Sequence, residues 1–204
     1  MVTFLIDKKK VHVPTRWADV TLQQAIDLSA NKNADVVVTL SILTGLPYDT
    51  CYRLRTGDVD ALITPVLQWL NEDVNEQDLL NQRPPEIFQL GDSRYFLRSF
   101  KPGAMIYAQH LNLETIVNDK QRKDIDKVAP CIAICIQNPE KYSEDRQKVI
   151  EQLVGAMPLS EAFAIAGFFL AKFLTFSNKP SSASRIIQLN KYGRELRTLR
   201  DSEQ

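Results

Sequence analysis

Apolar residues recur along this chain at helical spacing, most densely in the run from Met157 to Phe176, MPLSEAFAIAGFFLAKFLTF. Charge enters that run only at Glu161 and Lys172. A helix that is apolar on nearly every side belongs at the centre of a core or in a subunit contact. The stretch between the two charges is shorter than the roughly 20 apolar residues of a membrane span, so we predict a core helix without membrane insertion.

The clearest amphipathic helix is predicted to begin at Asp58. Its apolar residues follow the i, i+3, i+4, i+7 spacing: Val59, Leu62, Ile63, Val66, Leu67 and Leu70. Asp58 is expected to cap the start of this helix, because its carboxylate can accept a hydrogen bond from a free backbone N–H. Pro65 is expected to bend the helix without dividing it in two.

Similar patterns predict further helices at residues 20–28, 35–44, 105–113, 123–137 and 142–156. Gly45 suits the left-handed position that ends a helix, and a turn is expected around Pro47. Pro130 is expected to interrupt its helix, because a proline inside a helix removes one backbone hydrogen bond.

Two β-rich stretches, Val2–Val13 and Glu86–Arg98, each contain a turn and are predicted to form hairpins. A bulky aromatic residue follows each hairpin, Trp17 in one case and Phe100 in the other. Helical segments then follow in the same order. This repeated order has two explanations that the sequence leaves open, an internal duplication and a chance similarity of α-rich segments.

We therefore predict a mainly α (α+β) fold, a helical bundle core with two small β-hairpins. Residues 1–80 would form a half made of one hairpin and three helices. Residues 81–178 would form a second half, the duplicate, packed on the first. Residues 179–204 would form a C-terminal helical tail.

The composition is that of a globular protein, with 204 residues, 44% of them hydrophobic, and 25 basic against 25 acidic side chains. Zero net charge disfavours nucleic acid or an anionic membrane as the main partner. Cys51, Cys131 and Cys135 do not have the spacing of a disulfide framework, and the first residues lack the pattern of a signal peptide. A reducing, intracellular environment is expected.

Residue types that carry chemistry occur without the spacing of a catalytic or metal site. Cys131 and Cys135 would share a helix face, but zinc needs four ligands and their apolar neighbours favour core cysteines. His12 and His110 would need an oriented partner to act as bases. Acidic pairs near helix starts are expected to serve as caps: Asp58 with Asp60, and Asp124 with Asp126. We predict no enzyme activity, no cofactor and no metal site.

The C-terminal tail reads SRIIQLNKYGRELRTLR, with apolar residues three, four and three positions apart, which predicts a short seam for one partner helix. It is also more basic than acidic. An alternative function is therefore nucleic-acid binding or regulation through its basic side chains: Arg185, Lys191, Arg194, Arg197 and Arg200. The interspersed acids favour a solvated helix with one apolar seam.

Four segments, WADVTLQQAIDL, LSILTGLP, GDVDALITPVLQWL and PLSEAFAIAGFFLAKFL, resemble in helix pattern a group of small α-rich proteins of tailed bacteriophages. These proteins are described as tail-assembly-chaperone-like or as virion components. The resemblance extends from Trp17 to Phe176 and carries no catalytic residues. It implies a non-enzymatic role in virion or tail assembly, with other phage structural proteins or further copies of the chain as partners. The implied location is the host cytoplasm during assembly, and retention in the virion is left open.

Apolar residues beyond the needs of a small core usually mark a partner surface. In this chain they concentrate in the phenylalanine-rich run and in the tail. The predicted partner interface consists of these side chains: Phe163, Phe168, Phe169, Phe173, Phe176, Leu189, Tyr192, Leu196 and Leu199.

Overall fold

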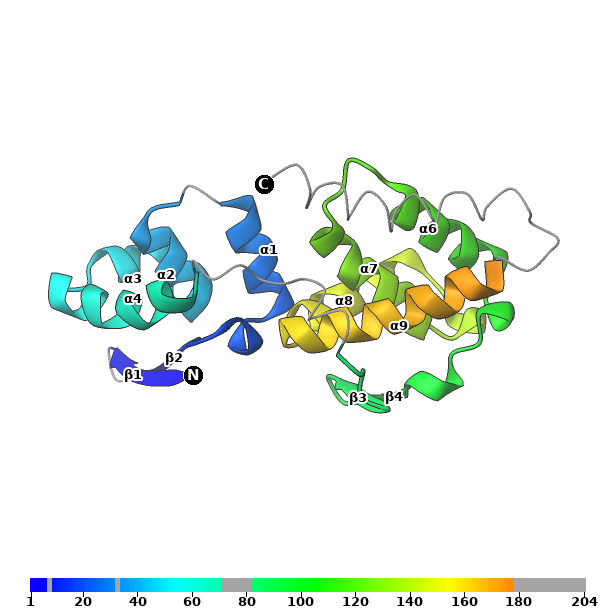
Figure 1. The fold of residues 1–204 in the computed structure, drawn as a ribbon, viewed down its shortest axis with the longest axis horizontal. Helices are drawn as coiled ribbons and strands as arrows, with labels where there is room; N and C mark the ends of the chain where they lie inside the picture. Colours follow the sequence, from blue (N-terminus) through cyan, green and yellow to red (C-terminus); the bar gives the residue numbers. More distant parts are fainter. Residues whose placement is uncertain (7–8, 32–33, 71–81, 178–204) are drawn as a thin grey trace, which may run out of the picture.

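The computed structural model describes residues 1–6, 9–31, 34–70 and 82–177 of the chain. Across these residues the protein is mainly helical and contains two separate two-stranded antiparallel sheets. The predicted mainly α (α+β) class is therefore confirmed. Figure 1 shows the two hairpin-containing halves placed one after the other along the long axis.

The first half begins with a hairpin in which β1 (Val2–Ile6) pairs with β2 (Lys9–Val13). Val11 and Val13 alternate with exposed residues along β2 and are buried, so one face of the hairpin is anchored to the core. Its helices follow in this order: η1 (Trp17–Asp19), α1 (Leu22–Ala30), α2 (Val36–Thr44), α3 (Tyr48–Tyr52) and α4 (Thr56–Leu70).

The second half also begins with a hairpin, in which β3 (Ile87–Leu90) pairs with β4 (Ser93–Phe96) through a turn at Gly91. Gly91 has a φ of 56°, which a residue without a Cβ adopts readily. The helices that follow are η2 (Leu97–Ser99), η3 (Pro102–Ala104), α6 (Tyr107–Asn118), α7 (Asp124–Ile136), η4 (Pro139–Lys141), α8 (Glu144–Gly155) and α9 (Leu159–Ser177).

The start of α4 and the course of α7 differ from the sequence prediction. Because α4 begins at Thr56, Asp58 lies in its first turn and is not its cap. The expected interruption at Pro130 is wrong, since α7 runs through that residue. All residues of α7 from Val128 to Cys135 are buried, and this tertiary packing outweighs the single hydrogen bond that the proline removes.

The predictions for Pro65 and Gly45 agree better with the structure. Pro65 lies inside α4, which remains one helix. Gly45 ends α2 with a φ of 69°, the left-handed conformation expected for it. The short helix α3 was missed, since only a turn was expected after Pro47.

Each half contains a glutamine in the first turn of its first α helix that binds the end of the next helix. In the first half, Gln24 Oε1 accepts the Thr21 N–H at 2.9 Å, and Gln24 Nε2 donates to the Leu43 carbonyl at 2.9 Å. In the second half, Gln109 Oε1 accepts the Ile106 N–H at 3.2 Å, and Gln109 Nε2 donates to the Ile134 carbonyl at 3.1 Å. The same side chain thus joins α1 to α2 and α6 to α7.

Each half also contains an edge-to-face aromatic pair between the segment after its hairpin and its last helix. Trp17 meets Trp69 of α4 with ring centroids 5.0 Å apart, and Phe100 meets Phe169 of α9 at 4.8 Å. The Trp69 indole also donates to the Pro14 carbonyl at 3.1 Å. The sequence had paired Trp17 with Phe100, and the structure gives these two residues comparable neighbours.

The halves meet where the start of α1 lies beside the turn between α8 and α9. The Leu22 N–H donates to the Met157 carbonyl at 2.9 Å, and the Leu159 N–H donates to the Val20 carbonyl at 2.8 Å. These two bonds flank an antiparallel bridge between Thr21 and Pro158. Hydrogen bonds between main-chain atoms therefore fix the register of the two halves, and the residues that make them are mostly buried.

Candidate partner interface

The phenylalanines predicted to meet a partner do not all reach the surface. Phe163, Phe169 and Phe173 are buried in the core of this chain, which removes them from the predicted interface. Phe168 is half-buried, and Phe176 is 37% exposed. The physical reason is that α9 packs along α7, η1 and η3, so these elements cover most of its apolar circumference.

α9 is also long and apolar enough, by length and composition alone, to cross a membrane. In this structure one side of it packs on α7 and the rest of the core, with Ala162, Ile165 and Phe169 fully enclosed or nearly so. The tail residues of the predicted interface lie outside the described residues: Leu189, Tyr192, Leu196 and Leu199.

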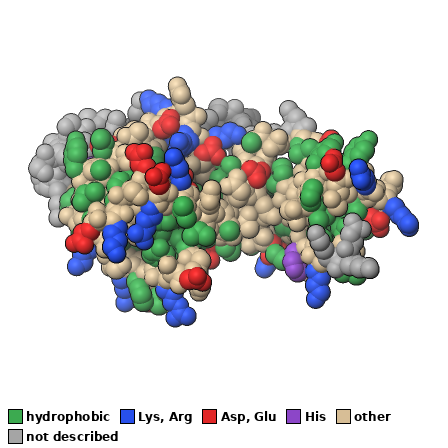
Figure 2. All heavy atoms as spheres, turned by 180° about the vertical axis from the view of Figure 1, so that it is seen from behind, with side chains coloured by type: hydrophobic (Ala, Val, Ile, Leu, Met, Phe, Trp, Pro, Cys, Tyr) green, Lys and Arg blue, Asp and Glu red, His purple; other side chains and the backbone are tan. Residues whose placement is uncertain are grey.

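Exposed apolar side chains that sequence reasoning missed lie in pairs four residues apart on three helices. Tyr48 and Tyr52 of α3 are stacked with ring centroids 6.0 Å apart, and both are exposed. The other pairs are Tyr107 with Leu111 on α6 and Val149 with Leu153 on α8. Figure 2 shows apolar side chains reaching the surface in several clusters over both halves. The four-residue spacing was visible in the sequence, but only the fold reveals that these side chains remain exposed.

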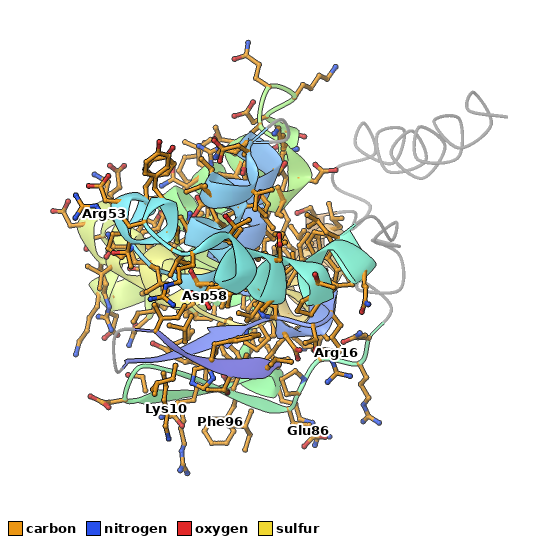
Figure 3. The ribbon with its side chains drawn as sticks, turned by 90° about the vertical axis from the view of Figure 1, so that its left-hand side faces the viewer. Lys10, Arg16, Arg53, Asp58, Glu86 and Phe96 are labelled. Carbon is orange, nitrogen blue, oxygen red and sulfur yellow. The ribbon has the colours of Figure 1, made fainter. Side chains whose placement is uncertain are left out.

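The β3–β4 hairpin carries a further exposed pair, since Ile87 and Phe96 lie directly opposite each other and are both more than half exposed. Figure 3 shows Phe96 pointing away from the hairpin toward solvent. Beside this pair, Arg98 is bonded to the carboxylate of Glu86. The outer face of this hairpin thus combines an apolar pair with charged neighbours, as protein interfaces commonly do.

A pocket of about 410 Å³ opens between the β3–β4 hairpin, the η2–η3 segment, the start of α6 and the end of α7. Its buried walls include Phe88, Phe100 and Phe169, and its exposed rim includes Phe96 and Lys101. Gln109 and Gln137 also line it, but their amides are used within the fold, in bonds to the backbone of α7. Such a pocket offers apolar contact to a side chain from outside the chain.

The candidate chemical residues do not converge on one site, since Cys131 and Cys135 share α7 while His12 and His110 lie on β2 and α6. Burial raises the pKa of the Cys131 thiol to about 12 and that of Cys135 well above its ordinary value, so both remain protonated core thiols. His12 Nδ1 is 3.0 Å from the Thr3 hydroxyl, and His110 packs its ring on Phe173. Within the described residues no group of three or more metal-ligating side chains is brought together.

No protein-family profile, curated protein or solved structure matches this chain.

Proposed function

We propose that this chain is a non-enzymatic assembly protein of a tailed bacteriophage that acts through protein–protein contacts in virion or tail assembly. The observation that carries the proposal is the set of exposed aromatic and apolar side chains held on rigid helices, of which the stacked Tyr48 and Tyr52 are the clearest. Aromatic side chains lose little conformational entropy on binding and are enriched in protein interfaces. The sequence resemblance to phage structural proteins supplies the biological setting.

The proposed partners are phage structural proteins or further copies of this chain, and the proposed place of action is the host cytoplasm during assembly. Near-zero net charge supports this kind of partner, because it lets protein surfaces approach without long-range repulsion. It gives little support to the alternative, a nucleic-acid-binding role for the basic tail.

The proposal is tested by silencing the gene during infection and examining the lysate by electron microscopy. We expect phage DNA to accumulate normally while complete particles fall at least tenfold and incomplete ones accumulate. Complementation with Tyr48→Ser/Tyr52→Ser should fail, whereas the matched surface variant Leu5→Ser should restore particles. Normal particle numbers after silencing would refute the role in assembly. Purified chain that binds DNA, with affinity falling steeply as salt rises, would favour the alternative.

A further inference from the structure

The two halves use the same kind of turn between their last two α helices. In the first half the turn between α3 and α4 places Leu54 so that its N–H donates to the Cys51 carbonyl at 3.2 Å. In the second half the turn between α8 and α9 places Met157 so that its N–H donates to the Val154 carbonyl at 3.0 Å. Leu54 and Met157 each stand two residues before the following helix. The α3–α4 turn is therefore the counterpart of the α8–α9 turn.

The two halves also have corresponding edges, each formed by the residues that lead into the first α helix. Val20, Thr21 and Leu22 follow η1 and lead into α1, and 85 positions later Met105, Ile106 and Tyr107 follow η3 and lead into α6. The glutamine that binds the helix-start N–H stands at the same offset in both halves, which fixes this correspondence.

Among the residues that the structure describes, a turn covers only one of these two edges. In the first half the edge pairs with the α8–α9 turn through the two main-chain hydrogen bonds already described, and Leu22 is 0% exposed. In the second half the residue at the place of Leu22 is Tyr107, which is 79% exposed. Ile106 beside it is also exposed. Within the described residues, the Tyr107 N–H and the Met105 carbonyl, which correspond to the groups bonded in the first half, have no hydrogen-bond partner, and large apolar side chains stand beside them.

The exposed edge and the α3–α4 turn, where Arg53 and Arg55 are exposed, lie at opposite ends of the part of the chain that the structure describes. Figure 1 places α3 and α4 at one end of the long axis and the start of α6, beside the end of α9, at the other. The end of α9 lies against η3, since the Phe176 ring lies within 3.1 Å of where a Cβ on Gly103 would stand. Figure 3 faces the α3–α4 end and shows Arg53 pointing outward there. One end of the molecule thus carries an exposed turn, and the other end carries an exposed edge of the kind that such a turn covers within the chain.

We propose that the Met105–Tyr107 edge of one copy binds the α3–α4 turn of a second copy, repeating between molecules the junction that joins the two halves. Leu54 supplies the apolar residue of the turn, as Met157 does within the chain. The turn carries Arg55 where the internal turn carries Pro158, and an arginine guanidinium stacks favourably on an exposed tyrosine ring such as that of Tyr107. The exposed Tyr52 adds aromatic surface at the same end.

Such a contact joins different surfaces of the two copies, so it continues head to tail and does not close as a symmetric dimer would. Repeat proteins use the same logic, since each unit covers the open surface of its neighbour. This inference rests on the proposed function, which it deepens by naming a second copy as a partner.

Sedimentation velocity of the purified full-length chain, up to about 1 mM, tests the proposal. We expect oligomers that grow with concentration. Tyr107→Pro removes both the ring and the N–H of the edge at a helix-start position that tolerates proline, and Arg55→Glu reverses the charge of the turn, so each variant alone should associate at least tenfold more weakly than the parent chain. The matched control Val149→Glu, on exposed α8 surface away from both ends, should associate like the parent chain.

Mixing the two variants gives the decisive outcome. Tyr107→Pro keeps an intact turn and Arg55→Glu keeps an intact edge, so the mixture should form a one-to-one complex and nothing larger. Circular dichroism of each variant verifies that it is folded. A parent chain that stays monomeric throughout, or variants that associate like the parent, would overturn the proposal. Neither result would affect the particle counts that test the assembly role, so the two failures are distinguishable.

Discussion

The two halves share a plan and differ in how completely they are covered. In the first half, α3 has 5 residues and α4 has 15, whereas in the second half α8 has 12 and α9 has 19. The longer helices enclose α7, whose last two turns are almost wholly buried, while α2 has only Thr39, Leu40 and Leu43 buried. The length of the covering helices therefore decides which apolar residues become core.

Residues at equivalent positions in the two halves can also differ in exposure. Leu22 is fully enclosed because another part of the chain lies on it, and Tyr107 at the matching place is almost fully exposed. Both residues begin a helix after the same kind of segment. Exposure here follows from what the rest of the chain supplies, and much less from the residue itself.

The largest expected effect comes from the aromatic pair of the better-covered half. Phe169→Ala removes a ring that is 2% exposed and leaves a cavity against Phe100, so urea denaturation should show a loss of about 3–5 kcal/mol in the free energy of unfolding. Trp69→Ala should cost a similar amount, because Trp69 is nearly as buried and also loses its bond to the Pro14 carbonyl. Phe96→Ala, at a ring that is 56% exposed, serves as control and should cost less than about 1 kcal/mol. Equal losses for Phe169→Ala and Phe96→Ala would contradict the packing described.

The glutamines that join successive helices should give an intermediate effect that separates the halves. Gln109→Leu leaves the Ile134 and Gln137 carbonyls buried without their donor, at a cost of about 2–3 kcal/mol. Gln24→Leu should cost about 1 kcal/mol, because Gln24 is only half-buried and water can replace part of its bonds. Thermal unfolding of both variants measures the difference. A larger loss for Gln24→Leu than for Gln109→Leu would show that the first half is the better enclosed.

The smallest expected effect is the acid sensitivity of the first half. The terminal ammonium, with further hydrogen bonds from Thr15 and Arg16, lowers the pKa of Asp19 from 3.8 to about 2. Because the folded pKa is depressed, the carboxylate stabilises the fold above its ordinary pKa, and this stabilisation is lost as pH falls toward 2. Asp19→Asn should therefore cost about 1 kcal/mol at pH 7 and almost nothing near pH 2.

Urea denaturation at a series of pH values measures this convergence. Asp92→Asn, in the exposed hairpin turn of the second half, is the matched control. The second half has Ala104 at the place of Asp19, so no comparable contribution is expected there. A loss for Asp19→Asn that persists unchanged down to pH 2 would show that the carboxylate acts through its shape and not its charge.

Much of the fold was predictable because the hairpins and long helices carry strong alternating or helical patterns. The start of α4 was not, because Asp58 looks like a cap in sequence while Thr56 and Gly57 already continue the helix. Pro130 misled for a related reason, since the local cost of a proline is visible in sequence and the packing that outweighs it is not.

The candidate interface was less predictable than the fold. An apolar helix destined for a core has the same composition as one destined for a partner, so Phe163 and Phe173 could not be assigned from sequence. Tyr48 and Tyr52 stood in an unrecognised short helix, and only the fold shows that they remain exposed together. Exposure is a property of the neighbours that a residue acquires, which a local pattern does not contain.

The joint between α1 and the α8–α9 turn is made by N–H and carbonyl groups that every residue except proline possesses. Substitutions at Val20 or Met157 can change the packing around the joint while leaving its hydrogen bonds in place. Only a proline at Leu22 or Leu159 would delete one of these bonds. Because these residues are buried, exchanges between apolar side chains of similar size would keep both the packing and the two bonds. The spacing of the halves can therefore persist while the apolar residues at the joint change within that limit.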